Sequence, residues 1–77
     1  MPLLKITVST EYSSKLLRFM VGVHQKVGQV AKIAADRYGY DVTDQRWTLT
    51  IGSFMLDPES EVGRYCEDGE KVELMPL

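Results

Sequence analysis

Hydrophobic and polar residues alternate in two stretches near the start of the chain, residues 3–9 and 15–23. A period of two places every second side chain on the same face of an extended strand. The polar sequence TEYSS separates the two stretches, so we predict two half-buried strands joined as a β-hairpin. The apolar positions of these strands are Leu4, Ile6, Val8, Leu17, Phe19, Val21 and Val23.

A helical period follows the hairpin. In KVGQVAKIAADRYG the apolar residues stand at positions 27, 30, 31 and 34, the spacing of one face of an amphipathic helix. Gly39 suits the left-handed conformation that ends many helices. We therefore predict a helix over residues 26–38, although Gly28 is unfavourable in its first turn and no capping side chain precedes it.

The last third of the chain returns to strands. WTLTI alternates again over residues 47–51, and a Gly-Ser turn leads into the short strand FML, which Asp57-Pro58 ends. SEVGRYC is predicted to be a compact connection with Val62 and Tyr65 pointing inward. Asp68-Gly69 then turns the chain into a final strand, in which Val72 and Leu74 alternate with Lys71, Glu73 and Met75.

The order of two strands, a helix, two strands, a short connection and a last strand resembles the β-grasp of ubiquitin-like proteins. KVGQVAKIAADRYGY is similar to the helix of that family and its closing glycine. TDQRWTLTIGSFMLD resembles its Asp-Gln, apolar strand, glycine turn and Leu-Asp, and VGRYCEDGEKVEL its Tyr, polar turn and closing strand. These motifs also look like those of small bacterial ubiquitin-like proteins that accompany type VII secretion systems.

The resemblance implies an α+β fold with a mixed sheet of four to five strands packed on one helix. It covers nearly the whole chain, so residues 1–77 form a single domain. The last strand is then expected inside the sheet beside the first, with Val72 and Leu74 in the core.

The end of the chain bears on conjugation. Conjugated ubiquitin-like proteins and sulfur carriers of this superfamily end in a flexible Gly-Gly tail, because a side chain there would collide with the enzyme channel. This chain ends at Met75-Pro76-Leu77, with no glycine after Gly69. The expectation is therefore a protein that is neither a modifier nor a sulfur carrier, with a trimmed tail as the open alternative.

The open face of the sheet is the family's usual recognition surface. We favour the register in which Trp47 and Leu49 point into the core, since a large aromatic gains most from burial; the alternative turns Leu49 outward. The candidate partner-binding residues on this face are Leu16, Arg18, Met20, Thr48, Glu73 and Met75, with Tyr12 and Phe54 as secondary candidates. An edge strand near Phe54–Leu56 leaves a homodimer through strand pairing open.

Charge narrows the class of partner. The net charge is −2, and no basic stripe with interleaved aromatics appears, which argues against nucleic acid. Residues 1–56 carry +3 and residues 57–77 carry −5, so an acidic C-terminal surface is a second candidate for binding, beside a simple role in solubility.

No apolar run is long enough to span a bilayer. No signal peptide is recognisable, and Cys66 stands alone, which fits the cytoplasm or another reducing compartment.

Nothing in the sequence predicts an enzyme. His24 and Cys66 are the only histidine and cysteine, and no third residue has an orienting role. The acids of DPESE lack the spacing of a calcium loop, and the glycines build no phosphate loop. We expect no catalytic residue, metal or cofactor.

The hypothesis from sequence is a non-covalent protein-interaction module of ubiquitin-like fold. Two alternatives remain open at this stage. One is a processed modifier or sulfur carrier, and the other is a non-catalytic accessory subunit of a multicomponent enzyme or secretion assembly.

Overall fold

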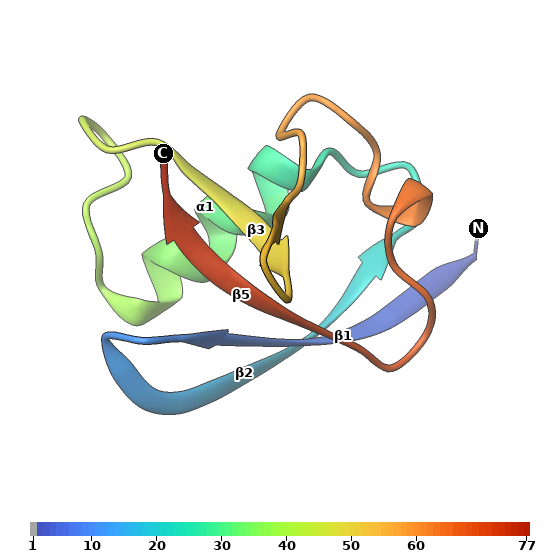
Figure 1. Cartoon of the computed structure of the whole chain (residues 1–77), viewed down its shortest axis with the longest axis horizontal. Helices are drawn as coiled ribbons and strands as arrows, with labels where there is room; N and C mark the ends of the chain where they lie inside the picture. The colour runs from blue at the N-terminus through green and yellow to red at the C-terminus, as the bar shows by residue number, and fades with distance from the viewer. Residues whose placement is uncertain (1) are drawn as a thin grey trace.

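The computed structural model describes residues 2–77. A mixed five-stranded sheet carries a single α-helix on one of its faces (Figure 1). The elements are, in chain order, β1 (Leu3–Thr10), β2 (Ser13–Gly22), α1 (Val27–Tyr38), β3 (Trp47–Ile51), β4 (Phe54–Met55), a 3₁₀ helix (Val62–Arg64) and β5 (Glu70–Pro76). The predicted α+β β-grasp order is confirmed.

The last strand lies in the middle of the sheet, whose order is β2-β1-β5-β3-β4. It pairs in parallel with β1, where Val72 lies opposite Val8, and antiparallel with β3, where Leu74 lies opposite Leu49. β1 and β2 form the predicted antiparallel hairpin. The prediction that the chain ends on an interior strand is therefore confirmed.

The core lies between the sheet and α1. The apolar face predicted for the helix is buried, and it packs against the inward residues of the strands. The fully or almost fully buried apolar side chains are Ile6, Val8, Val27, Val30, Ala31, Ala34, Ala35, Leu49, Leu56, Val62 and Leu74. Tyr65 packs half-buried against this core, as the sequence predicted for its position.

Helix α1 begins against the segment that contains Pro58 and Ser60. The amide groups of Val27 and Gly28 donate to the carbonyls of Ser60 and Pro58, both at 2.9 Å, so backbone acceptors replace the missing side-chain cap. A Cβ atom on Gly28 would lie 3.1 Å from the Pro58 carbonyl oxygen. The helix ends at Gly39, which has a φ of 83°.

A second close approach occurs at Gly63 in the 3₁₀ helix. Its amide donates to the Val23 carbonyl at 2.9 Å. A Cβ atom built on Gly63 would lie 2.8 Å from both the Cβ and the carbonyl oxygen of Val23. The connection before β5 can therefore lie against the end of the hairpin only because residue 63 has no side chain.

Three aromatic rings tie the end of α1 to the sheet. Tyr40 stacks between Tyr38 and Trp47, with ring centroids 5.4 Å apart on each side. The Tyr38 hydroxyl lies 2.6 Å from the Lys15 carbonyl oxygen and 3.2 Å from that of Val8, which joins the helix to the hairpin. Within residues 2–77, the buried Tyr40 hydroxyl has no hydrogen-bond partner.

The substitution Gly63→Ala should lower the free energy of unfolding by about 1–3 kcal/mol, because the added methyl group overlaps Val23. Gly22→Ala is the matched control: its Cβ would meet nothing closer than 3.8 Å, so a change within about 0.5 kcal/mol is expected. Urea denaturation followed by the fluorescence of Trp47 measures both. An equal loss of stability in the two variants would contradict the steric overlap predicted at residue 63.

The two stacked tyrosines should respond differently to loss of the hydroxyl. Tyr38→Phe removes a hydrogen bond and should cost about 0.5–1.5 kcal/mol of unfolding free energy. Tyr40→Phe removes a buried hydroxyl that is unpaired within residues 2–77, so stability should stay constant or rise by about 1 kcal/mol. Thermal and urea denaturation measure the stability of the two variants. A loss of stability in Tyr40→Phe equal to that in Tyr38→Phe would contradict the prediction.

Candidate functional site

The face of the sheet opposite α1 is uncovered (Figure 1). The strand registers place alternate residues of each strand on it, because paired residues in neighbouring strands share a face. The residues assigned to this open face are Leu3, Lys5, Thr7, Ser9, Leu16, Arg18, Met20, Thr48, Thr50, Met55, Lys71, Glu73 and Met75. All six primary candidates from the sequence belong to this set.

Three of the candidates form a row along the outer strand β2. Leu16 is 51% and Met20 57% exposed, and the exposed Arg18 lies between them. Leu3 on β1, which pairs with Gly22, lies diagonally beside Met20. We call Leu3, Leu16, Arg18 and Met20 the β2 patch. Three of its members are exposed apolar residues, and Arg18 lies between Leu16 and Met20 along the strand.

Met75 lies far from Met20 of the β2 patch. Glu73 and Met75 are both half-buried on β5. Glu73 lies beside Ser9, whereas Met20 lies beside Lys5, so Met75 and Met20 are offset by about six residues along the strands, or about 20 Å. Met20 and Met75 therefore lie on one face without forming one surface, because alternation assigns a face but not a position along the strand.

The prediction that Thr48 contacts a partner is wrong. It lies on the open face as predicted and pairs with Met75, but its exposed fraction is 0%. Its hydroxyl donates to the carbonyl of Leu56 at 2.8 Å, so the side chain serves the turn between β3 and the following segment. The buried hydroxyl is satisfied by this bond and has no access to a partner.

The favoured register of β3 is confirmed. Leu49 is fully buried opposite Leu74, and Trp47 lies on the same face opposite Pro76. Trp47 is half-buried against the core, and its indole Nε1 donates to the Asp41 carbonyl at 2.7 Å. The alternative with Leu49 outward is excluded.

The secondary candidates lie away from the β2 patch. Tyr12, in the turn between β1 and β2, is exposed and meets the edge of Tyr40 at 6.3 Å between ring centroids. Phe54 is exposed on β4, with its ring 6.0 Å from that of Tyr65. β4 is an edge strand of two residues, and a homodimer through it stays a prediction.

Sequence reasoning missed two exposed residues on the open face. Leu3 is 54% and Met55 50% exposed. Leu3 alternates in phase with Lys5 and Thr7 rather than with the core residues of the strand, so the alternation already indicated that it lies on the open face. Met55 takes its face from pairing with Thr50, which only the hairpin register reveals.

The residues of possible chemical interest lie in ordinary surroundings. His24 Nδ1 is 3.0 Å from Glu61 Oε1, and both side chains are exposed. Cys66 is buried in the core, where burial and then the charge of Glu70 raise the pKa of its thiol. Within residues 2–77, no three His, Cys, Asp or Glu side chains are placed to hold a metal ion. No helix in the same range is long and apolar enough to cross a membrane.

Comparison with known proteins identifies the fold. No family model matches the sequence, and no curated protein matches it. The structure superposes on Caldiarchaeum subterraneum ubiquitin with a TM-score of 0.80 and 19% identity, over 99% of this chain and 95% of that one. The ubiquitin-like domain of Plasmodium falciparum Dsk2 gives 0.78 and 17%, over 99% and 100%. A structure described as molecular mimicry of SUMO that promotes DNA repair gives 0.79 and 22%, over 95% and 90%. The chain therefore has the ubiquitin-like β-grasp fold.

The raised pKa of Cys66 makes stability depend on pH. In the unfolded chain the thiol ionises near pH 8.5, whereas the folded protein retains the proton to higher pH. Above about pH 8.5 the unfolded state binds fewer protons than the folded state, so the free energy of unfolding falls as pH rises. Urea titrations at pH 7.5 and 9.5 should show this fall, and Cys66→Ala should reduce it. An unchanged fall in Cys66→Ala would contradict the prediction.

Proposed function

We propose that this protein is a non-covalent interaction module that binds a protein partner through the β2 patch. The observation that supports the proposal is the row of exposed Leu16, Arg18 and Met20 on an uncovered sheet face. Methionine and arginine are enriched at protein interfaces, and methionine adapts to varied partner surfaces. The patch suits a partner that presents an apolar surface with an acidic group beside it, since Arg18 and the neighbouring Lys5 carry positive charge.

The proposal includes no catalytic activity and places the protein in a reducing compartment, where the buried Cys66 stays a thiol.

Experiment has to identify the partner and the complex to which it belongs. The protein would be a subunit of a larger complex, and a bacterial type VII secretion assembly is the finer affiliation that the sequence motifs suggest. Purification of N-terminally tagged protein from its native cell, with native and denaturing washes in parallel, identifies the partner. Heavier species that survive denaturation would indicate a conjugated modifier and overturn the proposal.

Met20→Glu should weaken binding of the recovered partner at least about tenfold, about 1.4 kcal/mol, because it buries an unpaired carboxylate in the interface. Met55→Glu is the matched control, since it makes the same change on the same face at the opposite edge of the sheet. Titration calorimetry with the purified partner measures both affinities. An equal effect of the two variants, or no effect of Met20→Glu, would show that the β2 patch is not the binding surface.

A further inference from the structure

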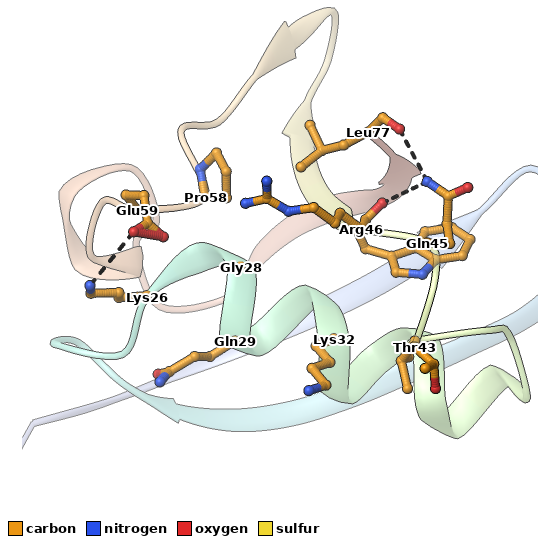
Figure 2. A pocket seen from close by; sticks show the side chains of 12 residues that line it. Lys26, Gly28, Gln29, Lys32, Thr43, Gln45, Arg46, Pro58, Glu59 and Leu77 are labelled. Atoms are coloured by element: carbon orange, nitrogen blue, oxygen red, sulfur yellow. Dashed lines mark hydrogen bonds and ion pairs between the residues drawn. The ribbon is translucent and has the colours of Figure 1, made fainter.

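A groove of about 430 Å³ opens beside α1, on the helix side of the sheet and away from the β2 patch. Four segments that are distant in sequence form it, namely the first half of α1, residues 42–47, Pro58 with Glu59, and Leu77. Figure 2 shows these segments around the first turn of α1, with the side chain of Arg46 extending across toward Pro58. Its volume is in the range of ligand-binding sites.

The groove is basic. Lys26, Lys32 and Arg46 line it, and Glu59 is its one acidic residue. Within residues 2–77, neither Lys32 nor Arg46 has a carboxylate within 4.0 Å. Lys26 lies 3.9 Å from Glu59, and both side chains are more than half exposed. A pair this long and exposed contributes little, so an incoming carboxylate can replace it.

The groove also has apolar walls. Val42, Trp47 and Pro58 line it. An adjoining hollow of about 350 Å³ shares Lys32 and Val42 with it and adds Ile33, which is 44% exposed. The two hollows together run along one face of α1, because residues 26, 29, 33 and 36 follow the helical repeat.

The length of this face fits a short peptide. Ten residues separate Lys26 from Asp36, at the two ends of the combined groove, which corresponds to about 15 Å along a helix. An extended chain rises about 3.3 Å per residue, so four or five residues span the groove. Alternate side chains of such a segment would face the apolar wall and the basic rim in turn.

We propose that this groove binds an extended, acidic peptide segment of another protein, with apolar side chains against Val42 and Trp47. Its carboxylates would pair with Lys32 and Arg46, and the guanidinium of Arg46 can hold a carboxylate by two hydrogen bonds. The site is separate from the β2 patch, so the protein would contact partners on both faces of its sheet.

The observations favour a peptide over a nucleic acid. The net charge of −2, Glu59 at the groove and Asp36 at the adjoining hollow oppose a long polyanion. One face of the Trp47 ring is already covered by Tyr40, so at most one of its faces is open for stacking with a base. A few carboxylates with intervening apolar side chains match the site better.

The test is an NMR titration of the ¹⁵N-labelled protein with a blocked seven-residue peptide of alternating glutamate and leucine. The amide resonances of Gly28 and Lys32 and the indole resonance of Trp47 should shift. The same peptide with glutamine for glutamate should bind at least about tenfold more weakly. An oligothymidine of ten nucleotides is the third probe, and it should not saturate these resonances.

Charge-reversal variants test whether the basic residues of the groove supply the binding energy for the peptide. Lys32→Glu with Arg46→Glu should weaken the acidic peptide at least about tenfold, and Arg46→Gln alone should weaken it less. Lys15→Glu with Arg64→Glu makes the same change in net charge at exposed positions outside the groove and should leave the affinity unchanged. Met20→Glu should also leave it unchanged, which separates this proposal from that for the β2 patch.

Three results would each overturn the proposal. The first is equal binding of the glutamate and glutamine peptides, or no binding of either. The second is an equal loss in the groove variant and in the control variant, which would indicate attraction by net charge alone. The third is tighter binding of the oligothymidine than of the acidic peptide, which would make the groove a nucleic-acid site.

Discussion

The structure depends on the pairing of β5 on both of its edges. The last strand fills the space between β1 and β3, and its Val72 and Leu74 complete the core under α1. Without it, β1 and β3 would each expose an unpaired edge, and the helix would cover an incomplete sheet. The parallel pairing of β5 with β1 joins residues about 64 positions apart, such as Val8 and Val72, a long loop that must close before its contacts stabilise the fold.

The open face is polar around this central strand. The middle of the open face is polar or small, with Thr7, Ser9, Thr50, Lys71 and Glu73 on β1, β3 and β5. The well-exposed apolar side chains lie toward the edge strands β2 and β4, or beside α1. Binding by the middle of the sheet would bury charged groups such as Lys71 and Glu73 at a cost in desolvation. The periphery of the sheet is therefore the better surface for recognition.

Periodicity predicted the elements and the inward face of α1, because both follow from the local pattern of apolar residues. The inward position of Trp47 was predicted from the size of its side chain. It failed where the outcome depends on register or on a neighbouring segment. Thr48 lies on the open face as its parity predicts, yet its hydroxyl donates a hydrogen bond to the Leu56 carbonyl and the side chain is buried. Met20 and Met75 share a face but are offset along the strands. The basic groove could not be predicted at all, since four separate segments build it.

Three acidic residues of the last third of the chain make contacts with residues of the first half. Asp68 accepts a hydrogen bond from the Lys5 amide at 2.8 Å, which places it beside the start of β1. Glu59 and Glu61 lie instead near Lys26 and His24, at the start of α1. The contacts of Gly28 with Pro58 bring this acidic segment against the helix. Glu59 thus lies at one end of the basic groove, while within residues 2–77 Lys32 and Arg46 have no carboxylate within 4.0 Å.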